Sequence, residues 1–260
     1  LFIAGIIPGV LLALAFVAAI YFMSVFTPKF VKQSEGDFAQ DIDLVGENDT
    51  WKLLSPIVIL MMIVLGGIYG GLFTPTEAGG VGTLGALIIG FVRKKLTIKK
   101  LWGVAMETGY VTSSICFLLI SAQLYASMLT MTGIPGDVSA MISEAGLNYF
   151  VILLGYVFVL LILGTFLDSV SIMLIVLPFV LPLMEGNQID LVWFGIVTVL
   201  AIEVGLLTPP LGMACFVIKA NLDDSRISLT EIFTGAFPFM LTMIIVLGLI
   251  IVFPSISLVL

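Results

Sequence analysis

Polar residues inside long apolar stretches are the part of this sequence best suited to chemistry. Asp168 stands in Gly164-Thr165-Phe166-Leu167-Asp168-Ser169, within the apolar run 149–184. An ionised carboxylate in such surroundings is costly, and it needs a counter-ion, a shell of hydrogen bonds or water. We therefore predict that Asp168 takes part in binding a cation, directly or through a ligand. The alternative is that it caps the following helix with help from Ser169 and Ser171, and the two roles are compatible.

A second interruption reads Glu203-Val204-Gly205-Leu206-Leu207-Thr208-Pro209-Pro210-Leu211-Gly212. Two successive prolines remove two amide donors and clash with the preceding turn, so we expect two half-helices here. The first half ends in carbonyl oxygens that suit a hard cation such as Na⁺. The second half begins with amide hydrogens that suit a carboxylate. One break therefore predicts both an ion site and a carboxylate site.

The residues of this break have separate expected roles. The carbonyls from Gly205 to Leu207 and the Thr208 hydroxyl are candidate cation ligands, whereas Pro209-Pro210 is expected in the first turn of the second half-helix. Gly212 allows another backbone or a ligand to come close. Glu203 lies about one turn before the break. It fits a hydrogen-bonding network with freed backbone amides as well as it fits the site itself.

The composition argues against several classes of chemistry. The sequence has no histidine, which removes the commonest general base and metal ligand near neutral pH. Cys116 and Cys215 lie far apart in apolar runs without metal-ligand spacing, so we interpret them as helix-packing residues. No nucleophile and base can be recognised as a pair. We expect no enzymatic activity and no cofactor.

Lipid is the solvent that the overall composition indicates. Of the 260 residues, 60% are hydrophobic and 10% are charged, against roughly 25% charged residues in soluble domains. A membrane-spanning helix needs about 20 mainly apolar residues. The apolar runs are 1–27, 53–73, 76–92, 108–131, 149–184, 191–218 and 233–253. The sequence therefore predicts an all-α polytopic membrane protein.

The run 149–184 is too long for one membrane span and short for two, because a bilayer core is about 30 Å thick. A re-entrant helical hairpin with its tip near Asp168 fits this length better. Lipid does not tolerate non-helical backbone at membrane depth, so the tip must lie in protein or in a wet cavity. The run 191–218, interrupted at 205–212, is predicted to be a discontinuous transmembrane helix.

The basic loop 93–100 sets the predicted orientation. It carries five Lys or Arg residues, and the positive-inside rule places it in the cytoplasm. Counting crossings back places the acidic loop 28–52 in the cytoplasm too. The net charge of −7 is concentrated in that loop, so it does not mark a surface for nucleic acid. We expect residues 96–106 to lie along the membrane interface before the span 108–131. A short external stretch is expected after that span.

The turn that contains Gly71-Leu72-Phe73-Thr74-Pro75 joins two predicted helices at a membrane edge. Thr74 or Thr76 is expected to cap the second helix. Glu77 fits the first turn of a helix through the helix dipole alone. The pentapeptide is similar to 205–209, but so short a match arises easily by chance in apolar sequence. We predict a mainly structural role for this turn.

Several segments together resemble the large membrane subunit of tripartite ATP-independent periplasmic (TRAP) transporters, of the DctM and SiaM type. They are Leu1–Gly9 (LFIAGIIPG), Gly66–Ala78 (GGIYGGLFTPTEA), Gly164–Asp168 (GTFLD), Glu203–Gly212 (EVGLLTPPLG) and Phe253-Pro254. They follow the family's order from one end of the chain to the other. Each alone is a modest signal, and together they are specific.

The resemblance implies an elevator-type secondary transporter driven by Na⁺, a multi-pass protein of the bacterial inner membrane. It implies import of an organic acid, such as a C4-dicarboxylate, a sialic acid or a similar carboxylate, delivered by a periplasmic substrate-binding protein. A small four-helix membrane subunit is the implied partner in the lipid bilayer. The family's first inverted repeat would precede Leu1. We therefore expect the C-terminal portion of the subunit, with roughly half of the ion and substrate machinery.

In that fold the chain divides into a membrane helix 1–27, a cytoplasmic loop 28–52 and mainly scaffold helices in 53–131. Residues 149–220 belong to the moving transport domain, and 233–253 form the terminal membrane helix. The expected sodium-binding residues are Gly164, Asp168, Gly205, Leu207 and Thr208. The expected substrate region holds Thr165, Ser169, Pro209, Pro210 and Gly212.

Two other functions remain open. A stand-alone sodium–carboxylate symporter of the same broad architecture would need no binding protein. A membrane scaffold that only docks a partner would not transport. In that case substitutions at Asp168 and Thr208 would leave transport by the assembled complex unchanged.

Overall fold

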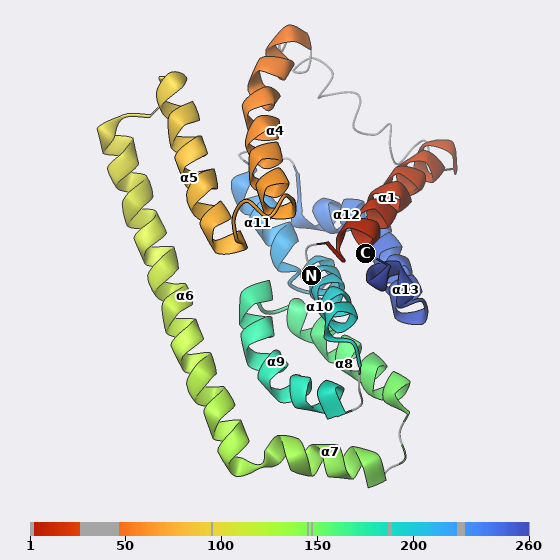
Figure 1. Ribbon diagram of the computed structural model, residues 1–260. Helices are drawn as coiled ribbons and strands as arrows, with labels where there is room; N and C mark the ends of the chain where they lie inside the picture. The colour runs from red at the N-terminus through yellow and green to blue at the C-terminus, as the bar shows by residue number, and fades with distance from the viewer. Residues whose placement is uncertain are drawn as a thin grey trace. The chain divides into compact units, whose positions relative to one another are not determined.

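The described part of the chain consists of helices joined by turns and short loops, and it contains no strand (Figure 1). The computed structural model describes residues 3–26, 47–94, 96–144, 146, 148–186, 189–222 and 227–259. The helices in these ranges are α1 (Ile6–Phe26), α4 (Glu47–Tyr69), α5 (Pro75–Val92), α6 (Ile98–Thr132), α7 (Ile134–Glu144), α8 (Tyr149–Gly164), α9 (Ser169–Gly186), α10 (Leu191–Leu207), α11 (Met213–Asn221), α12 (Leu229–Val252) and α13 (Ser255–Leu258).

Helices α1, α5, α6 and α12 are each long and apolar enough to cross a membrane. The apolar parts of α4, α8, α9 and α10 are shorter, at Leu54–Tyr69, Tyr149–Gly164, Ser169–Leu181 and Leu191–Leu207. The 16 residues of α8 extend about 24 Å, less than a bilayer core of about 30 Å. These findings agree with the predicted all-α polytopic membrane protein. The re-entrant path of 149–184 stays a prediction.

Three helices differ from what the sequence indicates. Helix α6 is continuous from Ile98, so the expected start near residue 108 is wrong, because no proline lies there to stop the helix. Helix α7 occupies most of the stretch expected to be a short external segment. Helix α4 begins at Glu47, inside the predicted loop 28–52. Residues 28–46 of that loop lie outside the described residues.

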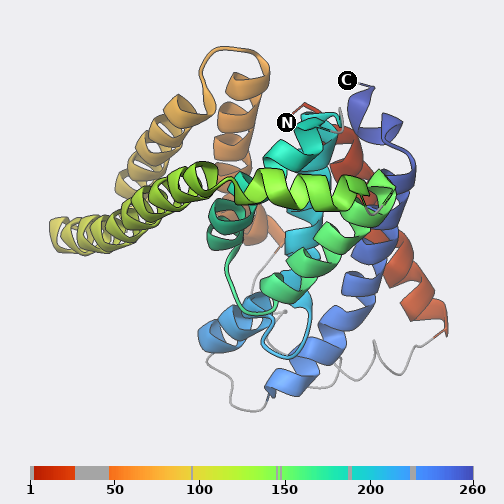
Figure 2. The same ribbon diagram turned by 90° about the horizontal axis from the view of Figure 1, so that it is seen from below.

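The chain divides into two compact units, one of residues 1–25 and 115–260 and the other of residues 26–114. In the first unit α10 lies between α8 and α12 (Figures 1 and 2). Helix α1 reaches α12 through Phe16, whose ring centroid is 5.5 Å from that of Phe239. The fully buried apolar side chains at the centre of this unit include Leu153, Leu160, Ile172, Phe194, Val197 and Ile250.

Two buried polar contacts fix α10 against its neighbours. The indole Nε1 of Trp193 donates a hydrogen bond to the Ile250 carbonyl of α12 at 2.8 Å. The Thr198 hydroxyl lies 2.9 Å from the Tyr156 hydroxyl of α8 and donates its hydrogen to the Phe194 carbonyl at 2.8 Å. A threonine hydroxyl has one hydrogen, so Tyr156 is the donor to Thr198. These bonds fix the register of α8 and α12 on α10.

In the second unit α4 packs on α5, and the turn between them is built from local contacts. Gly71 has a φ of +68°, which glycine adopts without steric cost. The Thr74 hydroxyl accepts a hydrogen bond from the Glu77 amide at 3.3 Å, and the Glu77 carboxylate accepts one from the Thr74 amide at 2.8 Å. This capping box identifies Thr74, rather than Thr76, as the helix cap.

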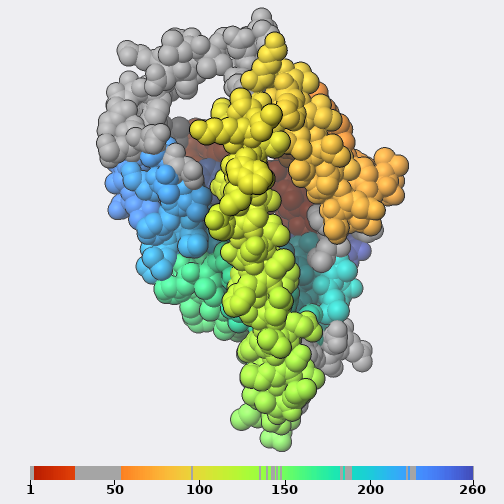
Figure 3. All heavy atoms as spheres, turned by 90° about the vertical axis from the view of Figure 1, so that its left-hand side faces the viewer, coloured from red at the N-terminus to blue at the C-terminus, as the bar shows by residue number. Residues whose placement is uncertain are grey.

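The long helix α6 is exposed along most of its length, as the yellow and green atoms in Figure 3 show. Its one buried residue among those described is Leu129. Large apolar side chains such as Trp102 and Phe117 are 70% and 71% exposed. A helix with this surface is suited to lipid rather than to water.

Candidate functional site

The predicted hairpin tip is a tight turn between α8 and α9. Helix α8 ends at Gly164, and α9 begins at Ser169. The carboxylate of Asp168 accepts hydrogen bonds from the amides of Val170 and Ser171, both at 3.1 Å, and from the Ser171 hydroxyl. The Asp168 side chain is exposed. The capping role is therefore present, and it leaves the carboxylate accessible for a second role.

The second interruption separates α10 from α11. Thr208 ends α10: its amide donates to the Gly205 carbonyl at 2.9 Å, and its hydroxyl donates to the Val204 carbonyl at 2.7 Å. Helix α11 begins only at Met213, after Gly212 with φ +43° and ψ +73°. The expectation of two half-helices is therefore correct.

The expected position of the two prolines is wrong. Pro209 and Pro210 lie in the turn before α11 and not in its first turn, and the peptide bond between them is cis. Pro209 precedes a proline, and that position is disfavoured in the α conformation. Gly212 in the left-handed region then redirects the chain into α11. The prolines therefore define the turn, and the glycine defines the start of the second helix.

The prolines also decide which carbonyls remain free at the end of α10. A helical carbonyl accepts from the amide three or four residues later. For Leu206 both of those residues are prolines, Pro209 and Pro210, which have no amide hydrogen. The Gly205 carbonyl instead accepts from Thr208. The Leu206 carbonyl therefore lacks both of the amide donors that a helix normally provides.

Gly164 and Gly205 are the point where α8 crosses α10. A Cβ atom on Gly164 would lie 2.7 Å from the Gly205 Cα, and a Cβ on Gly205 would lie 2.8 Å from the Gly164 Cα. Such distances leave no room for any side chain, and the obstructing atoms are backbone that cannot rotate away. The crossing brings the last turn of α8 and the last turn of α10 together. The hairpin tip and the helix break therefore start from one shared contact.

Helix α12 contributes two residues that the sequence analysis missed. The Met240 sulfur lies 3.5 Å from the Thr208 hydroxyl oxygen. The Phe233 ring covers Gly212, where a Cβ atom would lie 2.6 Å from the Phe233 Cε1. In the sequence, Phe233 and Met240 are ordinary members of an apolar helix, so their spacing indicates a shared face but not what that face touches.

The other predicted residues differ in their exposure. The Thr165 side chain is 5% exposed, and its hydroxyl donates to the Ile162 carbonyl at 2.8 Å. Leu207 and Ser169 are half-buried, whereas Pro209 and Pro210 are exposed. Glu203 is also exposed on α10, and its side chain makes no hydrogen bond to the described part of the chain. Its predicted part in a network therefore stays a prediction.

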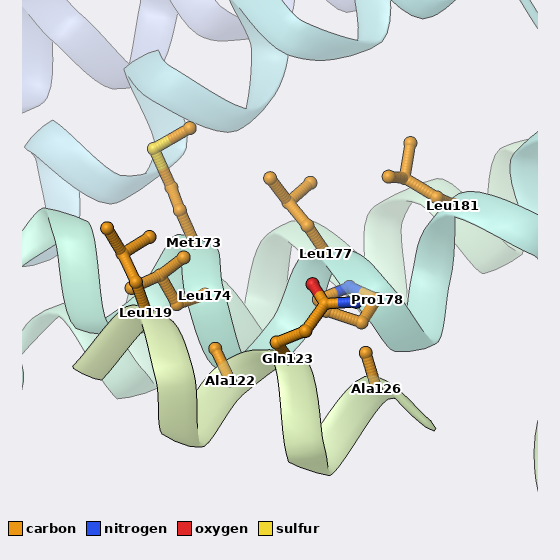
Figure 4. Close-up of a pocket in the computed structure, with 9 residues that line it drawn as sticks. All are labelled: Leu119, Ala122, Gln123, Ala126, Met173, Leu174, Leu177, Pro178 and Leu181. Atoms are coloured by element: carbon orange, nitrogen blue, oxygen red, sulfur yellow. The ribbon is translucent and has the colours of Figure 1, made fainter. Parts of the chain in front are cut away.

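A separate cavity of about 280 Å³ lies between α6 and α9 in the first unit (Figure 4). Gln123 is the polar side chain among the residues that line it, and its carboxamide points toward Pro178. The remaining lining residues are Leu119, Ala122, Ala126, Met173, Leu174, Leu177 and Leu181. This lining carries no charged group, so the cavity is a poor match for an ion or a carboxylate.

The sequence matches known transporter proteins along almost all of its length. Residues 1–256 match the family described as tripartite ATP-independent periplasmic transporter, DctM component. The sialic acid TRAP transporter permease protein SiaT of Haemophilus influenzae is 33% identical over 98% of this chain and 40% of its own length. The C4-dicarboxylate TRAP transporter large permease protein DctM of Pseudomonas aeruginosa is 33% identical over 99% of this chain and 58% of its own length.

A third relative, the sialic acid TRAP transporter large permease protein SiaM of Vibrio cholerae, is 32% identical over 100% of this chain and 59% of its own length. The chain thus spans between 40% and 59% of the length of these relatives. The family match confirms the resemblance found in the sequence, and the apolar helices fit a multi-pass membrane protein. This chain belongs to the DctM component family of tripartite ATP-independent periplasmic transporters.

Proposed function

We propose that this chain forms part of a Na⁺-coupled secondary transporter subunit that imports an organic acid. The observation that carries the proposal is the Gly164–Gly205 crossing, which joins the two interruptions of α8–α9 and α10–α11. Interrupted helices of this kind present backbone oxygens and amides at one place. An elevator-type movement of residues 149–220 as a transport domain is part of the proposal.

The cation site uses oxygen atoms at the ends of α8 and α10. The Leu206 carbonyl lacks the amide donors three and four residues later, because both residues are prolines, and the Leu207 carbonyl lies at the end of the same helix. Thr208 gives its hydrogen to the Val204 carbonyl, so the lone pairs of its oxygen point elsewhere. Asp168 adds the negative charge. Together with the backbone at Gly164 and Gly205, these groups form a hard oxygen site of the type that Na⁺ prefers.

The carboxylate of the substrate binds toward the start of α11. Gly212 provides no side-chain cap, so the first amides of α11 face the turn without a local acceptor from a side chain. The positive end of the helix favours an anion there. Ser169 and the backbone of Pro209-Pro210 complete the proposed substrate region. Relatives named for sialic acid and for C4-dicarboxylates have substrates that share a carboxylate, and we extend that shared group to this chain.

The proposed partners follow from the family. A tripartite periplasmic transporter includes a substrate-binding protein outside the membrane and a small membrane subunit beside the large one. We place the protein in the bacterial inner membrane on the same ground. The chain spans 58% and 59% of the length of two of these relatives, and the activity of the whole transporter is part of the proposal.

The test is uptake into proteoliposomes by the complete permease that contains this chain, with its small subunit and a panel of labelled carboxylates. We expect uptake only with an inward sodium gradient and with the periplasmic binding protein present. Uptake that persists with potassium in place of sodium would overturn the proposal that Na⁺ is the coupling ion. Uptake without the binding protein would instead favour a stand-alone symporter.

A further inference from the structure

We propose that Phe233 and Met240 of α12 are positioning residues for the cation site at the α10–α11 break. The inference rests on the proposed function, and it adds a helix outside both interruptions. The two residues are seven positions apart, which places them two turns apart on one face of α12. One meets the start of α11 and the other meets the end of α10. Helix α12 therefore contacts both sides of the α10–α11 break.

The Phe233 ring holds the start of α11. A Cβ atom on Gly212 would lie 2.6 Å from Cε1 and 3.0 Å from Cζ of this ring, so the ring fills the space that a side chain would take. The same ring meets Phe216 of α11 edge to face, with ring centroids 6.4 Å apart. Aromatic pairs prefer this edge-to-face geometry. The ring therefore fixes where α11 begins and where its first amides point.

Met240 holds the oxygen at the end of α10. Its sulfur lies 3.5 Å from the Thr208 hydroxyl oxygen, whose hydrogen already reaches the Val204 carbonyl at 2.7 Å. A thioether is a soft ligand and a weak acceptor, so it does not compete for a hard cation. Met240 is 8% exposed and packs in a cluster with Val204 and Met243. It acts by closing one side of Thr208 and keeping the free side of the oxygen turned to the ion.

Helix α12 is itself tied to α10 at a second place. Trp193, near the start of α10, donates to the Ile250 carbonyl near the end of α12. The contacts at Phe233 and Met240 therefore act from a helix that is fixed in register, and not from a freely moving one. Residues that orient the ligands of a metal ion typically change its affinity without binding it.

The test compares matched leucine variants of the complete permease. Phe233→Leu and Met240→Leu remove the two contacts, and Phe237→Leu and Met243→Leu are their controls on the same helix. Phe237 is 55% exposed, while Met243 is 6% exposed in the same cluster as Met240. A sodium titration of uptake gives the half-saturating sodium concentration and the maximal rate of each variant. Gel filtration gives the amount of folded protein.

We expect Phe233→Leu to raise the half-saturating sodium concentration about tenfold, which is the lower end of the effect of residues that orient metal ligands. We expect Met240→Leu to raise it about threefold, a smaller effect than that range. The control variants stay at the unsubstituted value. A purely structural role would lower the folded amount or the maximal rate at an unchanged sodium requirement, and that result would overturn the inference. Equal shifts in the controls would overturn it too. Uptake by the unsubstituted permease without sodium dependence would instead overturn the proposed function, and this inference with it.

Discussion

The same five-letter pattern builds two different structures in this chain. Gly71-Leu72-Phe73-Thr74-Pro75 and Gly205-Leu206-Leu207-Thr208-Pro209 differ at one position. In the first, the threonine is the N-cap of the helix that follows. In the second, the threonine is the C-cap of the helix that precedes it. A Thr-Pro pair therefore does not by itself determine which helix it serves.

The residues after the proline explain the difference. Glu77 stands three residues after Thr74 and closes a capping box with it. Leu211 stands at the matching position after Thr208, and its side chain has no hydrogen-bond acceptor. The Thr208 hydroxyl therefore donates to the Val204 carbonyl instead. The turn at 71–75 thus satisfies its own backbone. The break at 205–209 leaves oxygen atoms for something else, which is why we propose the ion site there.

The glycines of the two patterns differ as well. Gly71 has open space around its Cα and is needed for its positive φ. Gly205 has an ordinary helical conformation and is needed for its lack of a side chain against Gly164. One glycine serves the local backbone and the other serves a contact between helices. Substitutions should separate these two uses.

The largest expected effect is the loss of the helix crossing. Gly205→Ala places a methyl group against backbone, so we expect a loss of about 1–3 kcal/mol in unfolding free energy and a collapse of uptake. Gly155→Ala is the control, because a Cβ atom there meets open space on the neighbouring helix α8. Thermal unfolding in detergent measures both. Equal stability of the two variants would contradict the crossing.

The next effect concerns charge without loss of the cap. Asp168→Asn and Glu77→Gln each keep a side chain that can cap its helix while removing one negative charge. We expect Asp168→Asn to lower sodium-driven uptake about tenfold, as for the loss of a group at an ion site, and Glu77→Gln to leave it unchanged. Initial rates at fixed sodium provide the measurement. Normal uptake by Asp168→Asn would indicate that Asp168 only caps α9, or that the chain is a membrane scaffold that does not transport.

A smaller effect is expected from the two threonines. Thr208→Val removes a hydroxyl from the proposed site, and we expect a several-fold rise in half-saturating sodium with little change in stability. Thr74→Val removes an N-cap, and we expect a loss of about 1 kcal/mol in stability without a change in the sodium requirement. Sodium titration of uptake and thermal unfolding together distinguish the two. The comparison fails if both variants shift the same quantity.

The smallest effect on uptake is expected at the open glycine. Gly71→Ala puts an alanine at φ +68°, which costs roughly 1–2 kcal/mol in the left-handed region. We expect a slightly lower unfolding temperature and an unchanged sodium titration. A shift in the sodium requirement would mean that the α4–α5 turn also takes part in the ion site.

Sequence reasoning reached the features that depend on neighbours along the chain. The ends of α8 and α10, a cap at Thr74 or Thr76 and the capping role of Asp168 all follow from residue types within a few positions, and the structure selects Thr74. Proline, glycine and acidic residues act on the backbone beside them, so their spacing carries the information. The same reasoning misplaced Pro209-Pro210, because the start of α11 is decided by Gly212 instead.

The features that depend on distant residues were out of reach. Nothing in the sequence pairs Gly164 with Gly205, or Phe233 with Gly212, because a glycine or a phenylalanine in an apolar run has many possible partners. Helix α7 was missed for a different reason. Pro135 lies near its start, where proline is tolerated, but a proline beside a glycine reads first as a turn.

The buried indole of Trp193 gives the contact between α10 and α12 an optical signal. Trp193 is 4% exposed and hydrogen-bonded to a carbonyl of the other helix. Indole fluorescence shifts to longer wavelength when the ring is exposed to water, so a separation of these helices would be detected as a red shift of the emission maximum. The chain holds three tryptophans, and Trp51→Phe with Trp102→Phe would leave this reporter on the helix that ends at the break. Emission recorded during a sodium titration would then report whether α10 moves against α12.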